Sequence, residues 1–144
     1  MGNFSMKRET LAFDDASADV TVIDNLIYFR ISGVYNNEVA LKLAQYLEKL
    51  ISLIPESPIR VWDVRNVPAG AFQLSYCCIE QLSRWTRKIW EEKPGSLTYM
   101  VGSSTVSYGM ARMYGIKTNL EGTAVFALRS TDELPAEIKE KLQL

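Results

Sequence analysis

Groups that could perform acid–base or nucleophilic chemistry are few and scattered in this 144-residue chain. Histidine is absent, which excludes Ser-His and Cys-His catalytic pairs and imidazole metal sites. The remaining candidates fall on separate expected strands and helices: Asp63, Glu80, Lys93 and Tyr99. Single residues do not make a catalytic constellation. We therefore expect a protein that is not an enzyme and that binds no metal or cofactor.

The two cysteines are adjacent, at Cys77 and Cys78. This spacing matches neither a C-x-x-C redox motif nor a disulfide framework. On a helix the two side chains would point about 100° apart. We expect both to be small packing residues.

A glycine- and hydroxyl-rich stretch, VGSSTVSYGMARMYGI at residues 101–116, invites comparison with phosphate-binding loops. It contains neither the G-x-x-x-x-G-K-[ST] pattern of a P-loop nor the G-x-G-x-x-G pattern of a dinucleotide site. Its spacing instead predicts a helix whose start is capped by the hydroxyls of residues 103–105. Met110 and Met113 would fill the core, and Gly115 would end the helix with Ile116 folded back on it.

Gly109 is unusual in this predicted helix, because an interior glycine costs about 1 kcal/mol relative to alanine. Two explanations are open. The helix could approach the sheet or a neighbour closely at this point, or the missing side chain could leave room for a ligand beside Tyr108 and Arg112.

A second helical pattern over residues 75–92 combines aromatic and basic residues. Trp85 and Trp90 interleave with three cations, which are Arg84, Arg87 and Lys88. This composition is typical of helices that lie at a membrane surface. The alternative is ordinary packing, since Trp85 shares a helical stripe with Leu82 and Ile89.

Alternating strands and helices must position these segments. Two β-rich runs broken by Asp24-Asn25 predict a hairpin over residues 19–33, and apolar spacings of three and four predict a long helix from Asn36 or Asn37 to Ile54. The later predicted elements are strand 59–65, helix 75–92, strand 96–102, helix 103–115, strand 123–129 and a short helix within 130–142. The order ββαβαβαβα predicts an α/β fold in a single domain over residues 1–144. Its sheet would be mixed but mostly parallel, with packed helices and one antiparallel strand.

Charge and hydropathy narrow the environment and the partners. A net charge of −1 gives no broad positive field for a phosphate backbone, so we expect no nucleic-acid partner. The N-terminal residues lack the apolar core of a secretory signal, and no apolar run approaches the roughly 20 residues of a membrane span. We expect a cytoplasmic protein.

The order of elements, together with VWDVRNV at residues 61–67 and SYGMARMYGI at residues 107–116, resembles the SpoIIAA-like branch of the STAS domains, which are relatives of anti-sigma-factor antagonists. The resemblance extends from about Asp19 to Leu142. It is strongest at YGMARMY, residues 108–114, and Asp63 at the end of the third strand is similar to the family. It implies a small cytosolic α/β domain with a regulatory or binding role rather than catalysis.

The resemblance also points to the segment that opens the second long helix. In the antagonists, a serine within Asp-Ser-Ser-Gly lies there and is phosphorylated by a partner kinase. This chain has AGAFQLSYCC at residues 69–78, which places Ser75 near that position without the motif. Ser75 is therefore the candidate for a phosphorylation switch.

Two functions follow as hypotheses. The first is a protein-interaction module whose partner would meet residues 66–74 and the start of the next helix, including Arg65, Phe72 and Tyr76. The second is a protein that binds an apolar ligand or lipid, or associates peripherally with a membrane. Its candidate residues are Trp85, Trp90, Tyr108, Gly109 and Arg112. Self-association as a homodimer is the common default for either function.

Overall fold

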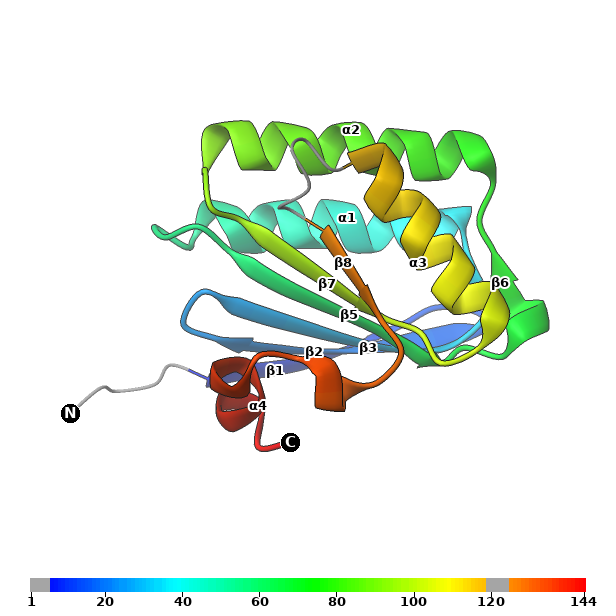
Figure 1. The fold of residues 1–144 in the computed structure, drawn as a ribbon, viewed down its shortest axis with the longest axis horizontal. Helices are drawn as coiled ribbons and strands as arrows, with labels where there is room; N and C mark the ends of the chain where they lie inside the picture. Colours follow the sequence, from blue (N-terminus) through cyan, green and yellow to red (C-terminus); the bar gives the residue numbers. More distant parts are fainter. Residues whose placement is uncertain (1–5, 119–124) are drawn as a thin grey trace.

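The structure is a computed structural model that describes residues 6–118 and 125–144 (Figure 1). Its strands are β1 (Met6–Ala12), β2 (Ala16–Ile23), β3 (Leu26–Gly33), β4 (Tyr35–Asn36), β5 (Ile59–Asn66), β6 (Phe72–Gln73), β7 (Leu97–Val101) and β8 (Val125–Leu128). Its helices are α1 (Asn37–Ser52), α2 (Tyr76–Glu92), α3 (Thr105–Thr118) and α4 (Ala136–Leu142), with single 3₁₀ turns at Ala69–Ala71 and Thr131–Glu133.

Six of the strands form one mixed sheet in the order β1-β2-β3-β5-β7-β8. The β1–β2 and β2–β3 pairs are antiparallel, whereas β3, β5, β7 and β8 run parallel. The short strands β4 and β6 pair separately. The expected α/β class and the mostly parallel mixed sheet are thus confirmed.

The predicted hairpin is present as β2 and β3. Ile23 pairs with Leu26 across a two-residue turn, and Asp24 takes the left-handed backbone conformation with φ of 54°. Aspartate tolerates this conformation better than most residues. The turn fixes the pairing register of β2 and β3, and in this register the side chains of Phe29 and Ile31 lie in the larger core.

Only β2 runs opposite to the other strands of the sheet, as expected, but the sheet also contains a strand that was not predicted, β1. The sequence MKRETLA of β1 is almost wholly exposed, so it carries no alternation of apolar and polar residues from which to predict a strand. It forms the edge of the sheet, where charged side chains discourage further strand pairing.

Helices α1, α2 and α3 lie over one face of the sheet, and α4 lies on the opposite side (Figure 1). The larger core fills the space under the three helices and includes Phe29, Leu43, Trp62, Ile79 and Tyr114. A smaller core lies under the C-terminal segment and includes Tyr28, Val61, Tyr99, Leu134 and Ile138.

Helix α1 follows directly from its sequence. Its buried residues Val39, Leu43, Leu47 and Ile51 recur every four positions, which places them on one face. The side chain of Asn36 accepts a hydrogen bond from the Val39 amide at 3.0 Å and caps the first turn.

Helix α3 begins as predicted but does not end at Gly115. Ser104 caps its start by accepting a hydrogen bond from the Ser107 amide at 2.9 Å. The helix continues to Thr118, and Ile116 is 75% exposed rather than folded back on the helix. Gly115 instead faces β8, where an added Cβ would lie 3.6 Å from Val125, so its small size serves packing rather than termination.

Candidate functional site

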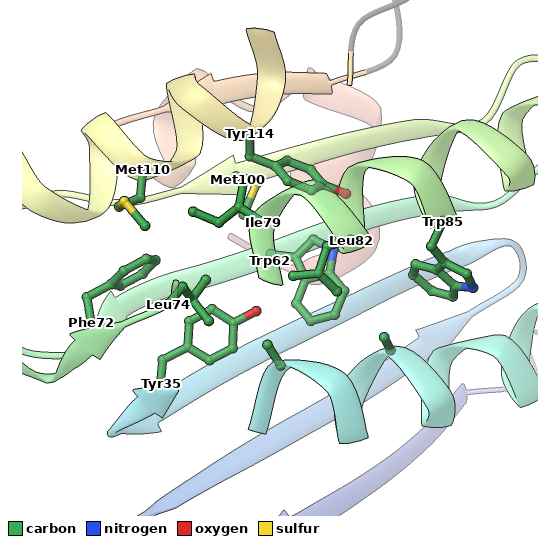
Figure 2. Close-up of a pocket in the computed structure, with 12 residues that line it drawn as sticks. Tyr35, Trp62, Phe72, Leu74, Ile79, Leu82, Trp85, Met100, Met110 and Tyr114 are labelled. Atoms are coloured by element: carbon green, nitrogen blue, oxygen red, sulfur yellow. The ribbon is translucent and has the colours of Figure 1, made fainter. Parts of the chain in front are cut away.

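An apolar pocket lies between the sheet and the helices over the larger core (Figure 2). Its floor includes Trp62 of β5 and Met100 of β7, which pair in the parallel register. Ala40 and Ala44 line it from α1, and their small side chains leave space above the floor. The other lining residues are Tyr35, Phe72, Leu74, Ile79, Leu82, Trp85, Met110 and Tyr114.

Aromatic packing fixes the walls of the pocket. Trp62 stacks on Phe29 with ring centroids 4.2 Å apart, so its ring is held against the sheet. Tyr35 and Phe72 meet edge to face at 5.4 Å, because β4 and β6 pair at these two residues. Phe72 and Trp85 lie at opposite ends of the pocket (Figure 2).

The free space within the pocket is about 30 Å³. A buried water needs roughly 10–15 Å³ by the same kind of measure, so this space holds a water or two. Met100 and Met110 are unbranched and change rotamer readily. A larger apolar molecule would therefore enter by displacing flexible side chains rather than by filling a rigid void.

Arg60 is buried beside this pocket. It is only 1% exposed and lies two residues before Trp62 on β5, which puts it on the same face of the sheet about 7 Å away. Its guanidinium carbon lies 5.9 Å from the centre of the Trp85 ring, within the range of a cation–π contact. No hydrogen bond or ion pair joins Arg60 to any residue within 6–118 or 125–144, and its Nε lacks a partner.

Two further buried polar atoms have no partner within the described residues, and one of them lies beside Arg60 in the sheet. Thr98 is the register neighbour of Arg60 on β7, is fully buried, and its Oγ1 makes no hydrogen bond. Ser83 on the buried side of α2 likewise has an unpartnered Oγ. One turn further along α2, Thr86 is hydrogen-bonded to the hydroxyl of Tyr114. We call Arg60, Ser83, Thr86, Thr98 and the Tyr114 hydroxyl the polar end. Of these, Tyr114 lines the pocket itself, whereas Arg60 and Thr98 lie two residues before the lining residues Trp62 and Met100 on their strands.

Burial dominates the electrostatics of the polar end. It lowers the pKa of the Arg60 guanidinium, an effect opposed by the nearby Tyr114, and it raises the pKa of the Tyr114 phenol. An arginine nevertheless keeps its proton in a protein, because its ordinary pKa is so high. The polar end therefore holds a buried positive charge, and the described residues supply no counter-ion.

The structure brings two of the sequence-predicted residues into the pocket. Trp85, proposed for a ligand or membrane face, and Phe72, proposed for a partner surface, both line it. Trp90 packs against the larger core without lining the pocket. Tyr108 lies under the guanidinium of Arg129, whose carbon is 4.0 Å from the ring centre.

The interpretation of Gly109 as a point of close approach is wrong. Gly109 is exposed, and an added Cβ would meet nothing within 4 Å. Neither it nor the exposed Arg112 lines the pocket, which contacts Met110 and Tyr114 of α3 instead. The close approach occurs at Gly102, where an added Cβ would lie 2.8 Å from the Oγ of Ser107.

The remaining sequence candidates lie outside the pocket. Ser75 is the N-cap of α2: its Oγ accepts from the Cys78 amide at 3.1 Å and from the side-chain amide of Asn37 at 3.1 Å. Tyr76, the first residue of that helix, is 56% exposed. Arg65 is held by Asp63, since its Nε and Nη2 donate to the two carboxylate oxygens at 2.9 and 2.8 Å.

Asp63 anchors a second polar cluster, beneath the opposite face of the sheet. Tyr28 donates to its Oδ2 at 2.5 Å in addition to the Arg65 bonds. Burial alone would raise the pKa of the Asp63 carboxyl, but the hydrogen bonds from Arg65 and Tyr28 outweigh it and hold the pKa below its ordinary value. Every charged group of this cluster has a partner, which is the pattern of a structural ion pair rather than of an open site.

Sequence reasoning missed the polar end. Arg60 falls within the predicted strand 59–65, and strand alternation puts it on the same face as Trp62 and Val64. That parity was the available signal. The buried positions of Ser83 and Thr98 had no comparable signal, because small hydroxyl residues occur on both buried and exposed faces.

Across residues 6–118 and 125–144, no group of three or more Cys, Asp or Glu side chains is placed to hold a metal ion. No helix in the same residues is both long and apolar enough to cross a bilayer. Comparison with known proteins found no matching family model, no matching curated protein and no matching solved structure. The geometry of the pocket is thus the basis for a function.

Proposed function

We propose that this protein is a non-catalytic binding module that holds a small apolar molecule in the pocket between its sheet and helices. The observation that carries the proposal is the lining of the pocket. Five aromatic side chains face one space together with two methionines: Tyr35, Trp62, Phe72, Trp85 and Tyr114, with Met100 and Met110. Sites for small molecules are concave and mostly apolar, with a few convergent polar groups.

The pocket's composition favours ligand binding over simple packing. Protein interiors are filled to the density of organic crystals, and the free space beside these large rings is only about 30 Å³, so an occupant requires side chains that can move. Adaptable methionines on two different elements border the same space, and such side chains suit a site that repacks around an occupant. These features support the ligand-binding alternative more directly than the exposed part of α2 does.

Ala44→Phe is expected to weaken the binding of an apolar alcohol by at least about tenfold, equivalent to 1.4 kcal/mol, because the added ring would occupy the pocket from α1. The ligand is ω-bromooctanol, whose bromine quenches tryptophan fluorescence on contact. Trp62 and Trp85 line the pocket and report on its occupancy. Wild-type protein should show saturable quenching that unbrominated octanol reverses.

Gln45→Phe is the matched control, since it adds the same ring at the neighbouring, exposed position of α1. It should bind the alcohol as the wild type does. Circular dichroism of both variants checks that the fold is retained. Quenching that does not saturate, or that is unchanged in Ala44→Phe, would refute the proposed function.

A second candidate is a regulatory interaction module, as the resemblance to SpoIIAA-like STAS domains implies. It is favoured by one observation: Phe72 and Leu74, within the segment predicted to meet a partner, also line the pocket. An occupant would therefore touch the predicted partner surface and could alter it. Phosphorylation of Ser75 stays a prediction; its exposed hydroxyl already caps α2.

A further inference from the structure

We propose that the molecule held in the pocket is an amphiphile with a single carboxylate, bound by Arg60 at the polar end, with its apolar chain toward Phe72. This inference rests on the proposed function and specifies the chemical class of the ligand. It is carried by the buried Arg60, whose Nε has no partner among the described residues, together with the unpartnered hydroxyl of Thr98 beside it and that of Ser83 on the buried side of α2.

The buried positive charge of Arg60 favours the binding of an anion. A buried ion without a partner costs several kcal/mol even after relaxation, so buried arginines are ordinarily paired with carboxylates. Arg60 lacks any such pairing among the described residues, and Trp85 offers only the face of an aromatic ring. An anionic ligand would supply the missing counter-ion.

The number of charges favours one carboxylate over a phosphate. Arg60 is the only lysine or arginine that is buried within the described part of the chain. One cation balances one monoanion, whereas a phosphate monoester brings close to two negative charges at neutral pH. The planar guanidinium also matches the two oxygens of a carboxylate in a bidentate pair.

The unpartnered hydroxyls suit the same head group. Ser83 Oγ and Thr98 Oγ1 can each donate one hydrogen bond, and neither does so within the described structure. Thr98 is adjacent to Arg60 across the β5–β7 pair. The Thr98 hydroxyl would therefore donate to a carboxylate that Arg60 holds.

Polarity changes along the pocket in the way that an amphiphile requires. On β5, Arg60 is followed on the same face by Trp62, and on β7, Thr98 is followed by Met100. Both strands thus run from a polar residue to an apolar lining residue in the same direction. Phe72 lies at the end of the pocket opposite Trp85, the ring that Arg60 contacts (Figure 2).

The test compares ω-bromooctanoate, ω-bromooctanol and octyl phosphate, which share a chain and differ in the head group. Quenching by the two bromo compounds and competition by octyl phosphate give the three affinities at neutral pH. We expect the carboxylate to bind at least about tenfold more tightly than the alcohol, the size of one charge-assisted hydrogen bond. In Arg60→Met this preference should disappear, whereas Arg84→Met, at an exposed arginine of α2, should keep it.

Thr98→Val provides a second, milder variant, expected to weaken carboxylate binding a few-fold and to leave the alcohol unchanged. Equal binding of carboxylate and alcohol by the wild type would overturn the carboxylate inference while leaving the apolar pocket intact. Tighter binding of octyl phosphate would overturn it in favour of a phosphate ligand. Binding of none of the three would overturn the proposed function as well.

Discussion

Replacement of Arg60 by methionine is expected to raise the free energy of unfolding of the ligand-free protein by about 1–4 kcal/mol. The substitution keeps a long unbranched side chain but removes a charge that is 1% exposed and unpaired within the described structure. Replacing buried ionic groups by apolar ones of similar volume is often stabilising, because the cost of removing the ions from water disappears. The lost contact with Trp85 offsets part of the gain.

Urea unfolding of protein freed of any bound molecule measures this change. Arg84→Met again serves as the control, since Arg84 is exposed and pairs with Glu80 one turn away; its effect should stay within about 0.5 kcal/mol. A loss of stability in Arg60→Met would show that the guanidinium stabilises the ligand-free fold. That result would contradict the proposal that Arg60 serves to bind the carboxylate of a ligand.

Asp63→Asn is expected to lower the free energy of unfolding at neutral pH by about 3 kcal/mol, because it leaves Arg65 without its counter-ion in a largely buried place. The amide also replaces a carboxylate oxygen that accepts from Tyr28. The partial exposure of Arg65, 31% for its side chain, keeps the loss at the lower end of the usual range for a broken buried pair.

The pH dependence of this loss has a definite sign. The folded-state pKa of Asp63 lies below its ordinary value, so the ionised carboxylate stabilises the fold above the unfolded-state pKa of about 3.9. That contribution is lost as the pH falls through the lowered folded-state pKa. The gap in stability between wild type and Asp63→Asn should therefore close as the solution is acidified from pH about 5.

Unfolding curves at several pH values test this, with Asp14→Asn as the control at an exposed carboxylate. The control should follow the wild type at every pH within about 0.5 kcal/mol. A gap between wild type and Asp63→Asn that stays constant from neutral pH to pH about 2 would contradict the assignment of the pKa to this cluster.

The framework of the protein could be read from local signals. The hairpin followed from Asp24-Asn25 between two β-rich runs, and α1 followed from its four-residue spacing and its Asn36 cap, since each depends on residues close in sequence. Strand β1 could not be read, because an exposed edge strand needs no apolar alternation. The end of α3 was misjudged because Gly115 is equally compatible with a helix end and with close packing on β8.

The pocket was only partly predictable for a related reason. Trp85 could be predicted as a site residue from the aromatic and basic composition of its helix. Trp62, Phe72 and Met100 come together only through the pairing of strands that are far apart in sequence. The burial of Arg60 depends on helix α2, whose Trp85 ring contacts the guanidinium. Gly109, by contrast, is unusual as a glycine inside a helix, but no neighbouring group lies close to it.

The most direct test is a crystal structure of the protein with ω-bromooctanoate, in which anomalous scattering locates the bromine atom without reference to the protein. The account predicts the bromine among Trp62, Met100 and Phe72, with the carboxylate in contact with Arg60. Bromine found only on the outer surface, with the pocket side chains closed over one another, would contradict it.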